Sequence, residues 1–233
     1  SSDVCSSDLV RNAAGELDYI PSGHEPHVIA GSRGGFPLHA RGVNEKDTSE
    51  LYVPKFFTLP ALDALRAAGG GHLQYDDFEK LIVKELTYKY ILNQLAIMPN
   101  RLPYDQAEAL RQALLTSDDL MATAKAFGLD DIPAFDIDLI RNPARDLDAA
   151  VDYATWFKTY LRADIADAKL GNKHAPFAGT FDIMRDVRDR IRYVIEHDYF
   201  DADAYEKFLR QFKPFDVSVS VGPPLERIEQ LLA

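Results

Sequence analysis

The chain has 233 residues, of which 46% are hydrophobic and 11% aromatic, enough apolar material for one large packed domain or two small ones. Its formal net charge is -11 and its pI is about 5.0, so it lacks the basic footprint of nucleic-acid-binding proteins. No stretch approaches the roughly 18 uncharged apolar residues of a membrane-spanning helix. We therefore expect a globular protein without nucleic-acid or membrane partners.

The first nine residues, SSDVCSSDL, are small and polar and contain no hydrophobic block of signal-peptide length. The string resembles one reading frame of a sequencing-adapter oligonucleotide, so we expect residues 1–9 to be a disordered, adapter-derived scar. Cys5 lies within it and is the only cysteine, which leaves no thiol for a disulfide or a thiolate elsewhere. A chain without further cysteines and without a signal peptide fits the cytoplasm.

Residues 10–54 are predicted to form a β-meander with a glycine-rich loop. Asn12–Gly15 is typical of a turn, Leu17–Ile20 of a strand, and the apolar run His27–Ala30 of a second strand that enters the loop. A metal site at His24 and His27 is not expected, because residues three apart on a strand face opposite ways and no third ligand is near.

The glycine-rich loop has features of an anion-binding site. Its glycines let successive backbone N–H groups point at one guest, and arginine side chains offer guanidinium forks for phosphate or carboxylate. No acidic residue occurs between His27 and Val43, a local reversal of sign in an acidic chain. The predicted cofactor-binding residues are Gly31, Ser32, Arg33, Gly34, Gly35, His39 and Arg41.

The same glycines also fit a simple hairpin turn, and this alternative stays open. The spacing is neither G-x-G-x-x-G nor G-x-x-x-x-G-K-[ST], and Pro37 blocks the helix that should follow such a loop. A nucleophilic role for Ser32 is not supported, because a nucleophile elbow needs glycine two residues earlier and a helix directly after.

Residues 55–214 are predicted to form a helical subdomain. Capping residues and glycine stops define its helices, and Ile132–Pro143 is predicted to be a surface linker between prolines. The predicted starts are Thr58, Asp76, Asp105, Ser117, Asp148 or Asp152, Thr180, and Asp201 or Asp203. The corresponding ends are Gly69, beyond Leu92, about Leu115, Phe127, Leu170, His197 and about Phe212, where Pro214 stops the last helix.

Two helical surfaces carry side chains of interest. The stripe Trp156, Phe157, Tyr160 and Leu161 is assigned to core packing, because aromatics at helical spacing usually bury large areas. The charged helix Thr180–His197 either presents a solvated face or directs Arg185, Arg188 and Arg192 at another part of a longer protein or its cofactor.

The last stretch, residues 215–233, is predicted to return as a strand, a turn and a helix. Phe215–Val221 alternates apolar and polar residues, and Gly222-Pro-Pro leads into a helix over Leu225–Leu232. The apolar helix reaches the last residue, which we interpret as a truncated end.

Three ordered sequence blocks carry a family resemblance. The first comprises YIPSGHEP (19–26), AGSRGGFP (30–37) and ARG (40–42); the second, AKLGN (168–172) and MRDVRDRIR (184–192); the third, SVGPPLERIEQ (220–230). Together they resemble a family of large FAD/NAD(P)-binding proteins, the flavin-dependent oxidoreductases. The family usually has arginine where this chain has His24 and Gly34, which implies weaker or different phosphate binding if those arginines contact a cofactor.

The resemblance implies an internal piece of a larger α/β, Rossmann-like flavoprotein with two dinucleotide-binding sites, the piece itself being α+β and mostly α-helical with a short N-terminal β-meander. FAD, NAD(P)H and a small-molecule substrate are implied for the whole enzyme, an NAD(P)H-dependent oxidoreductase or monooxygenase. No G-x-G-x-x-G motif is present, so we expect the piece alone to retain no cofactor and to be inactive. The alternative is a helical protein-interaction or regulatory domain without catalysis.

Overall fold

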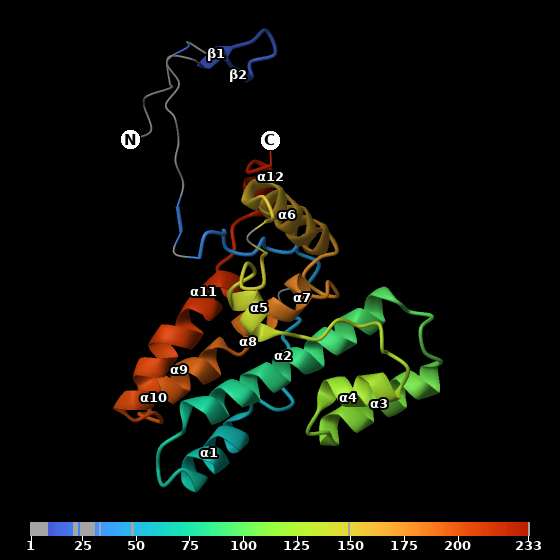
Figure 1. The fold of residues 1–233 in the computed structure, drawn as a ribbon, viewed down its shortest axis with the longest axis vertical. Coiled ribbons are helices and arrows are strands. Elements are labelled where there is room, and N and C mark those ends of the chain that lie inside the picture. The colour runs from blue at the N-terminus through green and yellow to red at the C-terminus, as the bar shows by residue number, and fades with distance from the viewer. Residues whose placement is uncertain are drawn as a thin grey trace. The chain divides into compact units, whose positions relative to one another are not determined.

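The computed structural model describes residues 9–20, 23, 31–32, 34–47, 49–148 and 150–232. The chain divides into two compact units, Ser1–Phe36 and Pro37–Ala233 (Figure 1). The first unit contains a two-stranded sheet and the second is helical, which confirms the expectation of a mostly α-helical chain with a short antiparallel β-element. No helix in the described ranges has the length and apolar character needed to cross a membrane.

The first unit is a small β-hairpin. Strand β1 (Leu9–Arg11) pairs antiparallel with β2 (Leu17–Tyr19), with Val10 opposite Asp18. The Asn12 side chain accepts hydrogen bonds from the backbone N–H groups of Ala14 and Glu16, both at 3.0 Å, which confirms the predicted turn. Leu9, assigned to the disordered scar, instead pairs with Tyr19, because its backbone completes the hairpin ladder. Residues 1–8 and the expected strand at 27–30 lie outside the described residues.

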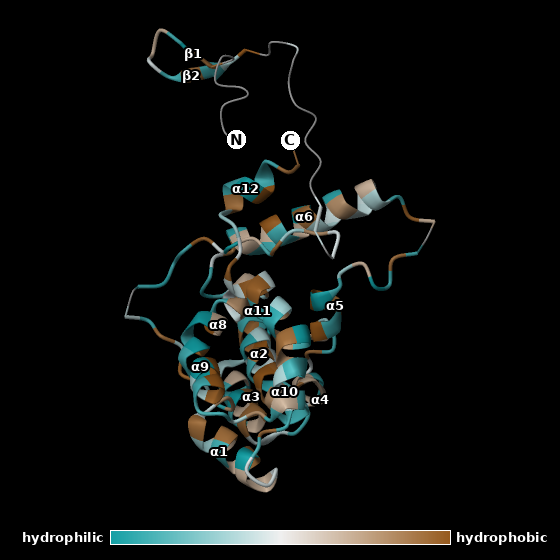
Figure 2. Ribbon diagram, turned by 90° about the vertical axis from the view of Figure 1, so that its left-hand side faces the viewer, coloured by the Kyte–Doolittle hydropathy of each residue, from teal (hydrophilic) through white to brown (hydrophobic). Residues whose placement is uncertain are grey.

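The second unit is built around one long helix, α2. The elements are α1 (Leu59–Ala68), α2 (Tyr75–Ile97), α3 (Tyr104–Thr116), α4 (Leu120–Ala126), α5 (Ile137–Arg141), α6 (Tyr153–Lys169), α7 (Ala178–Phe181), α8 (Ile183–Asp186), α9 (Arg188–Glu196), α10 (Ala202–Lys207), the π-helical turn η2 (Phe208–Phe212), α11 (Lys213–Ser220) and α12 (Leu225–Glu229). In Figure 2 hydrophobic and hydrophilic residues alternate around these helices, as in amphipathic helices that pack on a shared core.

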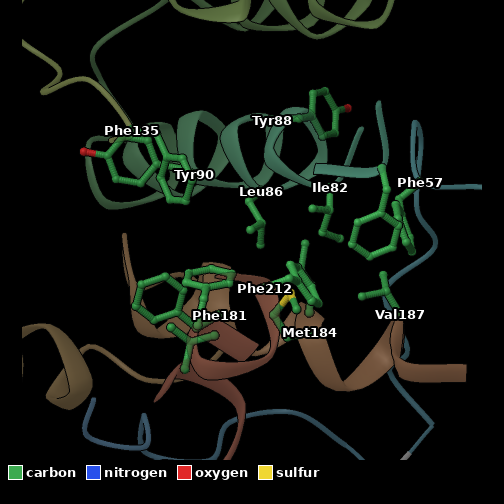
Figure 3. Close-up of a cluster of buried hydrophobic side chains, with 14 of the residues drawn as sticks. Phe57, Ile82, Leu86, Tyr88, Tyr90, Phe135, Phe181, Met184, Val187 and Phe212 are labelled. Atoms are coloured by element: carbon green, nitrogen blue, oxygen red, sulfur yellow. The ribbon is translucent and has the colours of Figure 1, made fainter. Parts of the chain in front are cut away.

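The main hydrophobic core lies between α2 and the α7, α8, η2 and α11 segments. Figure 3 shows Ile82 and Leu86 of α2 pointing toward Phe181, Met184 and Phe212, and all five side chains are at most 3% exposed. A separate, smaller cluster joins α6 to α12 through Leu161, Ile165 and Ile228. The second unit therefore has two hydrophobic clusters of unequal size.

A buried carboxylate fixes the loop before α1 onto α2. Glu85 is 0% exposed and accepts hydrogen bonds from the backbone N–H groups of Lys55 (2.9 Å), Phe56 (2.6 Å) and Phe57 (2.7 Å). The Tyr52 hydroxyl donates a fourth at 2.5 Å. Burial, with the nearby Glu85 charge as a second cause, raises the pKa of Tyr52, so this hydroxyl keeps its proton. Four donors saturate the Glu85 carboxylate and leave it no free acceptor toward another group.

Several helix starts are confirmed, with their caps. The side chains of Thr58, Asp152 and Asp201 accept hydrogen bonds from the backbone N–H groups of Ala61, Thr155 and Ala204. The glycine stops are confirmed where the backbone needs positive φ, as at Gly171 (φ 88°) after α6.

Three predicted caps are wrong. Helices α2 and α3 begin at Tyr75 and Tyr104, one residue before Asp76 and Asp105, and neither has a side-chain cap. Glu79, in the second turn of α2, binds the Tyr75 hydroxyl at 2.5 Å and the Arg141 guanidinium. Helix α4 is capped by Asp119 rather than by Ser117.

Two predicted segments differ because of tertiary packing. The surface linker at Ile132–Pro143 contains α5, whose first N–H groups donate to Asp136. The single helix over Thr180–His197 is replaced by α7, α8 and α9. Thr180, Phe181, Ile183 and Met184 are all buried, and one face of a straight helix cannot bury residues on every side.

The predicted strand at Phe215–Val221 is wrong, since residues 215–220 lie in helix α11 and Val221 is its C-cap. Phe212, Phe215 and Val219 follow helical spacing and are at most 9% exposed, so packing overrides the short alternation of valine and serine. Pro214 does not end the preceding helix, because it sits in the first turn of α11, directly after the wider π-helical turn η2.

Candidate functional site

A pocket of about 540 Å³ lies where the two hydrophobic clusters of the second unit meet. The residues that line it come from α2, α5 and α6, from the loops around them, and from the segment that carries His39. Figure 1 labels these three helices. Most of the lining is aromatic or aliphatic, and the polar and ionisable lining groups include His39, Gln94, Asp164 and Asp167. A mainly apolar pocket with a few convergent polar groups is the usual form of a small-molecule site.

One face of α6 supplies more lining residues than any other element. Trp156, Tyr160, Asp164 and Asp167 follow at intervals of four, four and three residues, which places them along one side of a helix. The rings of Trp156 and Tyr160 are stacked, with centroids 5.6 Å apart and planes at 14°. Along this face of α6, two aromatic side chains are therefore followed by two carboxylate side chains.

His39 and Asp164 form the central polar pair. His39 Nδ1 lies 2.9 Å from Asp164 Oδ1, and the Ala40 backbone N–H donates to Asp164 Oδ2 at 2.7 Å. The two side chains are only 12% and 11% exposed. An ionised carboxylate can only accept, so Nδ1 carries the hydrogen, and in the neutral form of the imidazole Nε2 is an acceptor. The Nε2 atom is buried and has no hydrogen-bond partner among the described residues.

The backbone around His39 is held by segments distant in sequence. His39 N–H donates to Ser218 O of α11 at 3.0 Å, and Arg41 N–H donates to Pro223 O at 3.0 Å. A Cβ atom on Gly222 would collide with the His39 carbonyl oxygen, so this close approach needs glycine. The C-terminal segment thus sets the position of the imidazole in the pocket.

Asp167 lies one turn beyond Asp164 and caps α7. Its Oδ1 accepts from Phe177 N–H at 3.1 Å and its Oδ2 from Ala178 N–H at 2.6 Å. Burial raises the pKa of Asp167 above its ordinary value, and these two hydrogen bonds oppose that effect. Burial also raises the pKa of Tyr160, with the charge of Asp164 as a second cause.

The described residues of the second unit do not fit the phosphates of a dinucleotide. Phosphate sites use helix N-termini free of negative charge. Of the helices with seven or more residues, only α1 lacks an acid at its cap or in its first turn, and Thr58 caps it. The others carry Asp76, Asp105, Asp119, Asp152, Asp189 and Asp216. The helix N-termini among the described residues of this unit therefore offer no site for the phosphates of FAD or NAD(P)H.

The predicted cofactor-binding residues fall in both units. Gly31, Ser32, Gly34 and Gly35 belong to the first unit and are exposed, and Gly35 has φ 76° in a turn where its N–H donates to Ser32 O at 3.2 Å. Arg33 lies outside the described residues. In the second unit, His39 lines the pocket, whereas Arg41 is exposed and makes no ion pair with the described residues. Phosphate binding by this set remains a prediction.

The sequence interpretation missed the part of the site that α6 provides. The sequence predicts Trp156 and Tyr160 in the buried core, but both are half-buried and line the pocket. The available signal was the continuation of this aromatic stripe by Asp164 and Asp167 on the same helical face, since carboxylates in line with a core stripe need a buried partner.

No family model matches the chain. It is 33% identical over 231 residues to an L-aspartate N-monooxygenase (nitrosuccinate-forming) of Streptomyces davaonensis, an alignment that covers 94% of this chain and 35% of that protein. It is 31% identical over 229 residues to a nitrosuccinic acid synthase of Aspergillus oryzae (93% and 34%) and 28% identical over 223 residues to an L-aspartate N-monooxygenase of Streptomyces cremeus (93% and 34%). The chain thus spans about a third of the length of these curated relatives.

Proposed function

We propose that this chain is part of an oxidoreductase, a monooxygenase that oxidises the amino nitrogen of a small amino acid such as L-aspartate. The observation that carries the proposal is the similarity along nearly the whole chain to three proteins named for one product, nitrosuccinate, in two bacteria and a fungus. The FAD and NAD(P)H implied by the sequence resemblance belong to the proposal for the longer protein.

The pocket gives the chain a role within such an enzyme. It joins a His39–Asp164 pair to aromatic walls in a region that the matched relatives cover almost completely. A histidine oriented by a carboxylate is a suitable proton acceptor, and an amine must lose a proton before its nitrogen can be oxidised. The pair is therefore the group in the described residues best placed to serve that chemistry.

The test uses the full reading frame recovered from the source DNA. The purified protein is incubated in air with FAD, NADPH and ¹⁵N-labelled L-aspartate, and products are identified by mass spectrometry. We expect labelled nitrosuccinate, and none when NADPH is omitted. A folded protein that consumes no NADPH with L-aspartate or other amino acids would favour the alternative, an interaction domain without catalysis.

A further inference from the structure

Among the described residues, the pocket lining contains acidic side chains but no lysine or arginine. Asp164 and Asp167 both line the pocket, and no lysine or arginine is among its lining residues. In the form with a neutral imidazole, the lining therefore has two acidic side chains and no side-chain cation. Such a pocket disfavours a guest whose only charged groups are anionic and favours a guest that presents a positively charged group.

The hydrogen-bonding groups of the pocket also favour a cationic ligand. Nε2 of His39 is buried and has no partner among the described residues, and it is an acceptor when the imidazole is neutral. Each Asp164 oxygen accepts one hydrogen bond, from Nδ1 of His39 or from Ala40 N–H, and a carboxylate oxygen can accept two. The pair therefore offers acceptors to a ligand and needs a donor.

The walls suit an organic cation in particular. Trp156 and Tyr160 stack on one side, and Tyr90 and Phe177 form a second aromatic pair with centroids 5.3 Å apart. Aromatic faces attract ammonium groups through their quadrupole and repel anions. Apolar walls beside the charged end also accommodate a hydrocarbon group.

We propose that this pocket is a binding site for an organic ammonium ion, whose N–H groups donate to His39 Nε2 and Asp164 and whose hydrocarbon part lies against Trp156 and Tyr160. The charge and shape of the pocket are the same whether or not the longer protein oxidises an amino acid. Amine binding is thus separable from the proposed enzymatic activity, and each can fail alone.

The chain provides its own reporter, because Trp156 is its only tryptophan. Three ligands of similar size and different charge are titrated into the 233-residue chain at neutral pH: benzylammonium, benzyl alcohol and benzoate. Tryptophan fluorescence is followed with excitation at a wavelength that tyrosine does not absorb. We expect benzylammonium to bind at least about tenfold more tightly than benzyl alcohol, and benzoate to bind most weakly.

Two variants locate the binding. Asp164→Asn should weaken benzylammonium about tenfold and change benzyl alcohol little, because it removes one charge and leaves the shape. Glu229→Gln is the matched control: it removes one negative charge beside α6, where Glu229 pairs with Lys169 on the surface, and should leave both affinities unchanged.

The three ligands test the proposal on the unmodified chain, even where a variant fails to fold. Benzoate binding as tightly as benzylammonium, or no fluorescence change with benzylammonium, would overturn the proposal. Equal loss of benzylammonium affinity in Asp164→Asn and Glu229→Gln would overturn it as well, since binding would then follow overall charge rather than this pocket.

Discussion

Two buried carboxylates in the second unit illustrate opposite uses of the same group. Glu85 lies in the main core and accepts from three backbone N–H groups and the Tyr52 hydroxyl. Asp164 lies in the pocket wall, accepts one hydrogen bond on each oxygen, and orients an imidazole whose other nitrogen has no partner in the described residues. The carboxylate of Glu85, whose acceptors are all used, stabilises a loop. The His39–Asp164 pair has unused hydrogen-bonding capacity, which is available to a ligand.

The largest expected effect concerns the saturated carboxylate. Glu85→Ala leaves several buried donors unpaired and should lower the free energy of unfolding by about 3–5 kcal/mol. Chemical denaturation of the variant and the parent chain measures this. Glu108→Ala on the half-exposed surface of α3 is the control and should cost less than about 0.5 kcal/mol. Similar losses in the two variants would show that the buried hydrogen bonds of Glu85 contribute no more to stability than a surface side chain does.

Lys89, one turn after Glu85 on α2, extends the comparison to a partly buried cation, whose hydrogen bond within the described residues is to Lys173 O at 3.0 Å. Burial, and next the charge of Lys46, lowers the pKa of Lys89 from 10.5 to about 8. Between these values the unfolded chain binds a proton that the folded chain does not, so stability rises with pH. We expect a gain of about 2 kcal/mol between roughly pH 8 and pH 10.

The check on Lys89 is a set of denaturation curves across that pH range for the parent chain and Lys89→Met. The rise should be much smaller in the variant. The raised pKa values of Tyr52 and Tyr75 reduce stability only above the ordinary tyrosine value of 10.0, at the upper edge of the window. An identical rise in both proteins would assign the pH dependence to another group.

Gly222→Ala tests whether the C-terminal segment positions the pocket histidine. The added Cβ meets the His39 carbonyl oxygen, so we expect a loss of about 1–3 kcal/mol and a change in Trp156 fluorescence. Gly31→Ala, whose Cβ would meet no atom within 4 Å, should be silent in both measurements. An unchanged Trp156 signal in a destabilised Gly222→Ala would mean that the pocket does not depend on this contact.

The smallest effect is expected at Arg41. The side chain is exposed, so Arg41→Ala should change stability by less than about 0.5 kcal/mol and leave benzylammonium binding unaltered. In the longer protein the same change should weaken NADPH or FAD binding if the predicted phosphate contact exists, by about tenfold to a hundredfold. Unchanged dissociation constants for both cofactors would leave Arg41 without a binding role.

Local signals in the sequence were sufficient for much of the fold. Thr58, Asp152 and Asp201 cap helices as predicted, because a cap depends on a few neighbouring residues. The errors occur where distant contacts decide: Phe215–Val221 becomes helical because its aromatic and aliphatic residues pack on the main core. Local alternation carries no information about such partners.

The candidate site was accessible from the sequence only in part. His39 was identified through the glycine-rich stretch, but its hydrogen-bond partner Asp164 is 125 residues away and was not identified. Pairing across that separation is set by how α6 packs against the segment of His39 and the C-terminal helices. Spacing rules act within one element, so no motif search brings these two residues together.

The π-helical turn at Phe208–Phe212 also limits the number of residues between α10 and α11. It lies in a continuous helical stretch from α10 to α11, whose residue Ser218 holds the backbone of His39. Each residue of an α-helix advances the chain by about 100°. The π-helical turn already holds one residue more than an α-helical turn, so loss of one residue there would let it close to an α-helical turn with little change of register. A further one-residue insertion would instead rotate everything after it by about that angle, taking Phe215 out of the core and Ser218 away from His39. A one-residue insertion in this short segment is therefore expected to be far less tolerated than substitutions on its exposed side.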